Sequence, residues 1–296
     1  MGHVEIQRDG HVADLLLTYV SGQVQVIKDQ ERLVRHGEPD SVHQMRVAMR
    51  RLRSVLATYG VLLDIDLVDH LRGELKWLGL ILGAERDAEV MRQRLTELVG
   101  SEPTERVAES AARHLREQLD ANFSAAHREV LGALGAERYL QLVNDLDALL
   151  SDPPLTSFAY EPIKKIVPNL VGEDWRRLRR AVAVLKEVCV DHESALHEIR
   201  KRAKRLRYAS ETAQLVDYEG ASRSANAAAG VQTILGDYHD SIVARDLIRK
   251  MCEQSGAEEA NKFFFEQLIS REECQAESSE IAFRKAWKRF PPGSLQ

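Results

Sequence analysis

The sequence has little of what marks secreted, disulfide-stapled or β-rich proteins. Its 296 residues include three cysteines, eight prolines and 17 glycines, and aromatic residues make up 6%. So few aromatic residues argue mildly against an all-β fold, and so little proline and glycine favours helices throughout. The cysteines, Cys189, Cys252 and Cys274, are odd in number and form no C-x-x-C pair. This pattern predicts a reduced, cytoplasmic chain and excludes a usual zinc knuckle.

Long apolar runs are also missing. No stretch approaches the roughly 18 to 20 apolar residues that a membrane span requires. The first residues, MGHVEIQRDGH, are polar and argue against a signal peptide, so we expect no membrane contact. Lys and Arg number 41 and Asp and Glu 46, which gives a formal net charge of −5. Because the whole chain is acidic, a site for anions must come from local clustering of basic side chains.

Helical periodicity extends over nearly the whole chain. It predicts helices at 12–35, 41–60, 66–83, 86–99, 104–132, 137–150, 158–171, 174–190, 194–217, 220–236, 239–254 and 257–288. The segment SDPPLTS at 151–157 is the strongest break and lies at the midpoint. We therefore predict an all-α protein with two halves, residues 1–152 and 153–296.

Two motifs of the first half recur in the second half. VHQMRVAMRRLR at 42–53 returns 154 residues later as LHEIRKRAKRLR at 196–207. LGAERDAEV at 82–90 returns as LGDYHDSIV at 235–243, with an offset of 153. Chance does not readily produce two such matched offsets, so the sequence predicts an internal duplication. We expect two antiparallel four-helix bundles related by a pseudo-twofold axis.

Each copy of the first motif lines up basic side chains on one side of a helix. At about 100° per residue, the basic residues of the first copy, apart from Arg51, fall within an arc of about 80°. This arc lies next to the apolar stripe that faces the bundle, and no acidic residue occurs within 43–53. The second copy repeats the arrangement. The stripe residues are His43, Arg46, Arg50 and Arg53 in the first copy and His197, Arg200, Lys204 and Arg207 in the second.

The alternative to a site is an ordinary solvated face, which is what most rows of Arg and Lys on a helix are. A solvated face does not need the same histidine-led order in both halves, however, and like charges in a row repel unless phosphate oxygens or another polyanion meets them. The following helix of the first half adds Arg72, Lys76 and Arg86, whereas the matching face of the second half is less basic. We therefore predict an anion-binding site to which both halves contribute.

The paired motifs resemble those of the CHAD family, the conserved histidine α-helical domain, over about residues 10–288. The resemblance implies two pseudo-symmetric four-helix bundles with a basic groove or pore between them. It also implies binding of inorganic polyphosphate through the stripe residues and association with polyphosphate granules. Lys76 and Arg86 fit the family pattern, whereas Ala229 and His239 depart from it at the matching positions. The first half is therefore expected to contribute more charge.

Many members of that family also carry a CYTH triphosphatase domain, marked by an ExExK motif. EIQR at 5–8 does not supply this motif, so a stand-alone binder is expected. The sequence has no Walker loop and no glycine-rich dinucleotide turn. His192 and His197 resemble a zincin pair only superficially, because they are five residues apart rather than four. We predict no enzymatic activity, no cofactor and no metal site.

An interaction protein of another kind is the alternative function. The same basic surface could serve a helical adaptor or a nucleic-acid-binding protein. Aromatic residues do not interleave the stripe, Tyr208 apart, and no DNA-binding module is recognisable, which does not favour nucleic acid. The sequence leaves the oligomeric state open.

Overall fold

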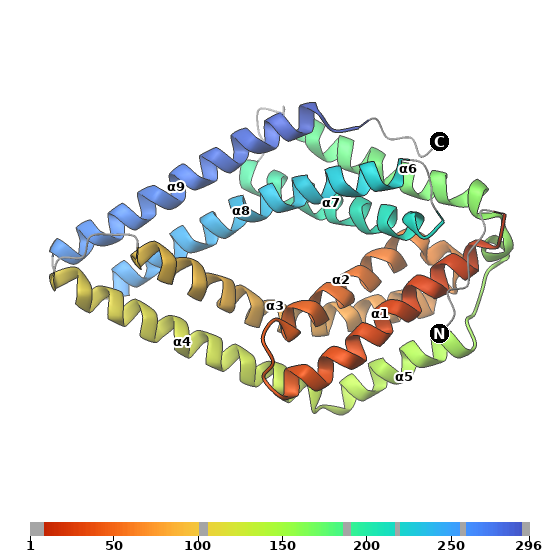
Figure 1. Ribbon diagram of the computed structural model, residues 1–296, viewed down its shortest axis with the longest axis horizontal. Coiled ribbons are helices and arrows are strands. Elements are labelled where there is room, and N and C mark those ends of the chain that lie inside the picture. The colour runs from red at the N-terminus through yellow and green to blue at the C-terminus, as the bar shows by residue number, and fades with distance from the viewer. Residues whose placement is uncertain (1–8, 101–105, 186–190, 217–219, 255–258, 292–296) are drawn as a thin grey trace.

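The computed structural model of the protein is built from helices (Figure 1). It describes residues 9–100, 106–185, 191–216, 220–254 and 259–291, so Cys189 and the EIQR segment lie outside the described residues. Within these ranges there are nine α-helices, two short 3-10 helices and no strand. The α-helices are α1 (Val12–Arg35), α2 (Ser41–Tyr59), α3 (Ile65–Gly100), α4 (Arg106–Leu134), α5 (Glu137–Ser151), α6 (Ile163–Val184), α7 (His192–Gln214), α8 (Ala221–Gln254) and α9 (Glu259–Lys288). The all-α prediction is confirmed, and no described helix combines the length and the apolar character needed to cross a bilayer.

Three of the helices are longer than the sequence predicted. α3 continues through Gly83 for 36 residues, α8 continues through Gly236 for 34 residues, and α6 continues through Gly172. The predicted helix ends at residues 83, 171 and 236 were therefore wrong. A glycine inside a helix costs only about 1 kcal/mol relative to alanine, and the packing of a long helix outweighs that cost.

The main core lies where α2 and α7 pack together. Met45, Met49 and Leu52 of α2 share it with Ile199 and Leu206 of α7, and all five are at most 1% exposed. These residues belong to the apolar stripes that the sequence predicted beside the basic ones. The core is continuous, because helices from both sides of residue 152 contribute to it.

A second, smaller core lies at the opposite end of the molecule. The hairpins α3–α4 and α8–α9 extend away from the main core and meet there (Figure 1). Leu95, Leu115, Phe265 and Leu268 are among its buried residues. Arg94 of α3 reinforces the contact through hydrogen bonds, which it donates to the Glu272 carboxylate of α9 (2.6–3.1 Å) and to the Ser241 hydroxyl of α8 (2.7 Å). The two parts of the chain are therefore joined at both ends.

Arg205 of α7 ties the main core together. It donates hydrogen bonds to the Ala57 carbonyl and to the Thr58 hydroxyl of α2 (3.2 Å). Its Nε also lies 2.8 Å from the carboxylate of Asp174 on α6, a residue that is only 1% exposed. Thr58 and Arg177 donate further hydrogen bonds to that carboxylate. Arg205 therefore supports the packing of α2, α6 and α7.

Candidate anion-binding site

Four basic residues of the two stripes meet where α2 and α7 pack. We call Arg46, Arg50, Arg200 and Lys204 the central cationic cluster. All four are half-buried, and the pKa of Lys204 is lowered by burial and then by the positive charges of the other three. Arg50 Nε donates a hydrogen bond of 2.9 Å to the Tyr208 hydroxyl, which holds the Arg50 side chain across the junction of the two helices. Residues about 150 positions apart in the sequence thus form one group of positive charges.

Lys204 is the residue of this cluster with the least compensation. Within the described residues its ammonium group has no hydrogen bond and no ion pair, and Asp87, which pairs with Arg46, only partly opposes the positive charges around it. Burial, followed by the charges of Arg200 and Arg50, lowers the pKa of Lys204 to about 6. A desolvated ammonium group without a carboxylate is unfavourable, and an anion placed beside it would restore its charged form.

Arg46 and Arg200 occupy matching positions against α3 and α8. The guanidinium group of Arg46 lies 3.5 Å from where a Cβ of Gly83 would be, and that of Arg200 lies 3.4 Å from the equivalent point at Gly236. Glycine at these positions lets each guanidinium lie close to the helix backbone. Arg46 also pairs with Asp87 at 3.3 Å. Asp87 therefore compensates part of the charge of Arg46.

Arg200 is less well compensated than Arg46. Its Nε is buried and has no hydrogen-bond partner among the described residues. Burial lowers the pKa of Arg200, and the carboxylate of Asp240 acts in the opposite direction. Burial in turn raises the pKa of Asp240. Asp87 and Asp240 thus lie beside four basic side chains and compensate their charge only in part.

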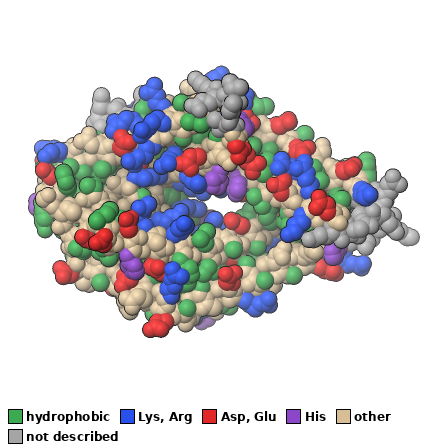
Figure 2. Space-filling model, turned by 180° about the vertical axis from the view of Figure 1, so that it is seen from behind, with side chains coloured by type: hydrophobic (Ala, Val, Ile, Leu, Met, Phe, Trp, Pro, Cys, Tyr) green, Lys and Arg blue, Asp and Glu red, His purple; other side chains and the backbone are tan. Residues whose placement is uncertain are grey.

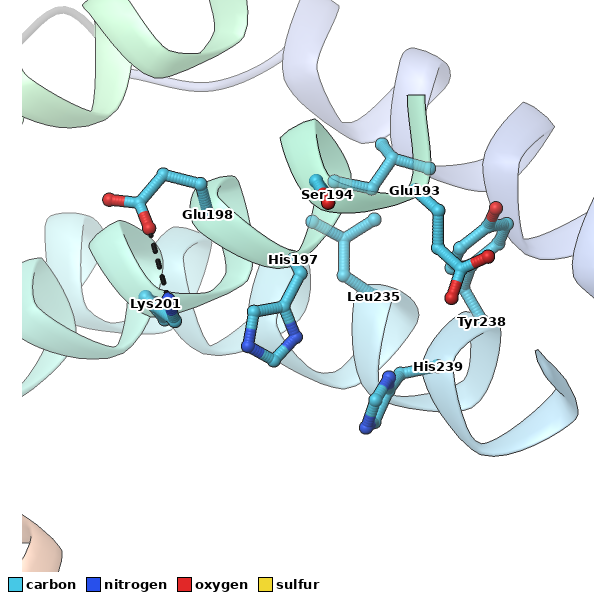
Figure 3. A pocket seen from close by; sticks show the side chains of 9 residues that line it. Glu193, Ser194, His197, Glu198, Lys201, Leu235, Tyr238 and His239 are labelled. Carbon is cyan, nitrogen blue, oxygen red and sulfur yellow. Dashed lines mark hydrogen bonds and ion pairs between the residues drawn. The ribbon is translucent and has the colours of Figure 1, made fainter. Parts of the chain in front are cut away.

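Three histidines flank the cluster. His43 lies in the first turn of α2, its Nδ1 is buried without a hydrogen-bond partner, and burial followed by the charge of Arg86 lowers its pKa. The rings of His197 and His239 lie with their centroids 5.3 Å apart and border a pocket of about 360 Å³ between α7 and α8 (Figure 3). Burial lowers the pKa of both imidazoles, and nearby cations lower it further.

The remaining predicted site residues lie around this centre. Lys76 is exposed. Arg53 is also exposed as a whole residue, but partial desolvation of its guanidinium group, followed by the charge of Arg72, lowers its pKa. Arg72 lies 3.4 Å from Asp69, whereas Arg86 donates a hydrogen bond of 2.5 Å to Glu89. Arg207 turns away from the cluster. Its Nε donates a hydrogen bond of 2.6 Å to Glu211.

Positive side chains also gather on the outer surface. Figure 2 shows Lys and Arg side chains beside a hollow near the middle of one face of the molecule, with histidine at its edge.

The described residues contain no group of three or more His, Cys, Asp or Glu side chains that could hold a metal ion. His192, the first histidine of the zincin-like pair, forms an ion pair with Glu280 at 3.1 Å.

Sequence reasoning missed two contributors to the site. Tyr208 follows the second stripe directly, but the corresponding position after the first stripe is Ser54, so comparing the two motifs gave no signal for it. Its ring lies 5.9 Å from the guanidinium carbon of Arg50 and 5.5 Å from that of Arg207. Asp240, which acts on Arg200, is the second contributor, and its recurrence at the position that matches Asp87 was a usable signal for it.

Comparisons with known proteins agree with this architecture. Two uncharacterized proteins of Mycobacterium tuberculosis, from two strains, are each 33% identical over 294 residues, which cover 92% of this chain and 53% of theirs. The chain therefore spans about half the length of the curated relatives it matches. PptA from Streptomyces chartreusis superposes with a TM-score of 0.80 at 24% identity, covering 94% of this chain and 99% of that one. The CHAD domain from the plant Ricinus communis gives 0.77 at 22% identity, covering 100% and 98%. The CHAD domain model matches residues 18–249, and the chain belongs to the CHAD domain family.

Proposed function

We propose that the protein binds inorganic polyphosphate without catalysing a reaction on it. The observation that carries this proposal is the position of Lys204, which lies among three arginines with no carboxylate of its own. Polyphosphate binding is also what the family resemblance implies. The proposed contacts are His43, Arg46, Arg50, Arg53, Arg72, Lys76, Arg86, His197, Arg200, Lys204 and Arg207.

The chemistry of the cluster suits a polymer of phosphates. Each arginine offers a planar fork for two phosphate oxygens, and Lys204 offers a point charge. Phosphate contacts supply affinity and release counterions, so binding should depend strongly on salt and need no sequence readout. Nucleic acid is a weaker candidate, because Tyr208 is 1% exposed and its hydroxyl is held by Arg50. It therefore offers no open face on which a base could stack.

We further propose that two duplicated halves, divided at residues 152 and 153, enclose a basic groove in which the polymer lies. The matched positions support this: Arg46, Gly83 and Asp87 in the first half correspond to Arg200, Gly236 and Asp240 in the second. The halves differ where Arg86 is replaced by His239. The first half is therefore expected to bind more tightly at neutral pH.

The proposal can be tested with long-chain polyphosphate at fixed salt. Arg50→Gln and Lys204→Met should each weaken binding at least tenfold, whereas Arg32→Gln and Lys250→Met, at exposed positions on α1 and α8, should leave it unchanged. Single- and double-stranded DNA serve as competitors. Unchanged affinity in the first two variants would place the site elsewhere, and equal affinity for nucleic acid would overturn the choice of polyphosphate.

A cytoplasmic location on polyphosphate granules is part of the same proposal. A fluorescently tagged protein should form foci in cells that contain granules and should be diffuse in cells that cannot make polyphosphate. Arg50→Gln should reduce the foci and Arg32→Gln should not. Foci that persist without polyphosphate would show that another partner recruits the protein.

A further inference from the structure

A second polar pocket lies beside the main core, apart from the histidine pair. It has a volume of about 350 Å³ and is formed by α1, α2, α7 and the first turns of α8. Tyr19, Gln23, Arg51, Arg207 and Glu211 line it. This volume is at the lower limit for small-molecule sites, which suits a ligand of few heavy atoms rather than a nucleotide.

Three lining side chains carry a buried polar atom with no hydrogen-bond partner among the described residues. These atoms are the Tyr19 hydroxyl, the Gln23 amide oxygen and Arg51 Nε. Tyr19 is only 8% exposed. Buried polar groups in folded proteins almost always have a partner, because an unpaired one costs about 1–3 kcal/mol. Three such atoms around one pocket indicate that a group outside the described residues satisfies them.

The pocket carries one positive charge in excess. Glu211 lies between two arginines: Arg207 Nε donates a hydrogen bond of 2.6 Å to one carboxylate oxygen, and Arg51 Nε lies 3.3 Å from the other without the alignment of a hydrogen bond. Burial and then the charge of Glu211 raise the pKa of Tyr19, so its phenol stays neutral and able to donate. An anionic ligand therefore meets two guanidinium groups, a phenol and one carboxylate.

The unpaired atoms define what the ligand must offer. Arg51 Nε–H can only donate, so the ligand needs an acceptor oxygen. The Gln23 amide oxygen and the Glu211 carboxylate can only accept, so the ligand also needs a proton to donate. A fully ionised carboxylate or sulfate has no such proton. A hydrogen phosphate group has both acceptor oxygens and a P–OH donor.

We propose that this pocket binds a hydrogen phosphate group, either as free orthophosphate or as the terminal phosphate of a polyphosphate chain. Only the second source rests on the proposed function. Internal phosphates of the polymer are fully ionised and carry no P–OH group, whereas a terminal phosphate, like a phosphorylated side chain, takes up a proton with a pKa of about 6 and so offers a P–OH group near and below that pH. The pocket therefore recognises an end rather than the middle of a chain.

The position of the pocket fits an end site. The guanidinium carbons of Arg51 and Arg207 lie 5.9 Å and 5.5 Å from the Tyr208 ring centroid. Arg50, in the central cationic cluster, lies 5.9 Å from the same centroid. One aromatic side chain thus separates the cluster from the pocket, and Arg207 continues the stripe of α7 into it.

The first experiment is calorimetric titration of the whole protein with orthophosphate and with sulfate near neutral pH. Orthophosphate should bind at one site, and sulfate should bind at least tenfold more weakly. Tyr19→Phe should weaken orthophosphate binding several-fold without lowering the melting temperature, because it removes an unpaired hydroxyl. Tyr139→Phe is the matched control, since that buried hydroxyl is already bonded to Glu31. Glu211→Gln should reduce the ratio between the affinity for orthophosphate and the affinity for sulfate.

The same variants separate the pocket from the polymer site. Long-chain polyphosphate should bind Tyr19→Phe nearly as well as the native protein, because the central cluster is intact. If the terminal phosphate is the ligand, short chains with free ends should bind native protein more tightly than Tyr19→Phe at about pH 6, where the end carries its proton. Short chains with esterified ends should bind the two proteins equally. Absence of saturable orthophosphate binding, equal affinity for sulfate, or an unchanged affinity in Tyr19→Phe would each overturn the pocket proposal. Loss of polymer binding alone would overturn only the proposed function.

Discussion

The guanidinium group of Arg200 lies against the backbone of Gly236, 3.4 Å from the point that a Cβ would occupy. The same relationship holds between Arg46 and Gly83 at 3.5 Å. In both cases a glycine inside a long helix gives the arginine room to lie between two helices. The position of the cationic group therefore depends on a residue that carries no charge.

A larger residue at Gly236 should displace Arg200 and lower polyphosphate affinity. We expect Gly236→Met to weaken binding several-fold, because methionine occupies the space of the guanidinium group while preserving the helix. Gly230→Met is the control on the same helix, since nothing lies within 4 Å of that position. Equal binding by the two variants, measured by titration with labelled polyphosphate, would contradict this role of Gly236.

Removing the charge of Lys204 should separate stability from binding. Lys204→Met replaces a lysine whose charged form is disfavoured by burial with an apolar side chain of similar length, so we expect the free energy of unfolding to rise by about 1–2 kcal/mol. Affinity for polyphosphate should fall about tenfold, because a charge-assisted phosphate contact is lost. Urea unfolding and titration of the same preparation measure the two effects. A variant that is both less stable and fully able to bind would refute the proposed role of this lysine.

Binding should become tighter as the pH falls from 8 to 6. Burial and neighbouring cations lower the pKa of Lys204 to about 6 and also lower the pKa of His43, His197 and His239 in the free protein. Phosphate favours the protonated form of each group, so the complex takes up protons that the free protein lacks. Affinity should therefore rise toward pH 6 and level off below it. Isothermal titration at several pH values checks the trend.

The stability of the unliganded protein should follow the opposite course. An unfolded lysine has a pKa of about 10.4, so between that value and about 6 the unfolded chain binds the proton that folded Lys204 does not. The contribution of Lys204 to the free energy of unfolding therefore falls as the pH falls through this window. In Lys204→Met this part of the pH dependence should be missing. If the free energy of unfolding depends on pH in the same way in the native protein and in Lys204→Met, this contribution of Lys204 is refuted.

The salt dependence of binding should report the number of cations in contact with the polymer. For a single strand of phosphates, each contact contributes about 0.7 to the magnitude of the slope of log K against log salt. Arg50→Gln should lower the slope by about that amount, whereas Arg32→Gln should not change it. A parallel loss of affinity at every salt concentration would show that Arg50 acts by positioning other groups and not by its charge.

Asp174 should be a strong determinant of stability. It is 1% exposed and accepts hydrogen bonds from Thr58 and Arg177, with Arg205 paired at 2.8 Å. Asp174→Ala leaves buried guanidinium charge without its carboxylate and should lower the free energy of unfolding by about 3–5 kcal/mol. Glu173→Ala, next to it but more exposed, should change the free energy of unfolding much less, because solvent screens its ion pairs. Chemical denaturation of both variants measures the difference.

Much of the arrangement of α2 and α7 could be predicted from residue spacing. The helical wheel correctly separated the apolar residues Met45 and Met49 from the basic residues Arg46 and Arg50, because it needs only the geometry of one helix. It could not predict that Arg207 would turn to Glu211. The direction of the Arg207 side chain depends on the Glu211 carboxylate, one helical turn further along α7, and on the pocket that α1 and α8 form beside these two residues.

The helix ends predicted at residues 83 and 236 failed for a related reason. A glycine weakens a helix only where nothing else supports the helix, and the sequence does not show the packing that supports α3 and α8. In the structure Gly83 and Gly236 are contact points for arginines of another helix. The second core could not be predicted from the sequence either, because it joins the ends of α3 and α8 to residues far away in the sequence, such as Phe265. Such contacts leave no periodic signal.

The second core has a consequence for how a ligand is received. Arg94 and Glu272 join the far ends of the long helices, while α2 and α7 are joined at the near end. Because the two parts of the chain are joined at both ends, they cannot move apart by a hinge motion without exposing one of the two buried cores. The spacing of the charged groups is therefore set during folding, and the loss of conformational freedom that binding normally entails has already occurred before a ligand arrives.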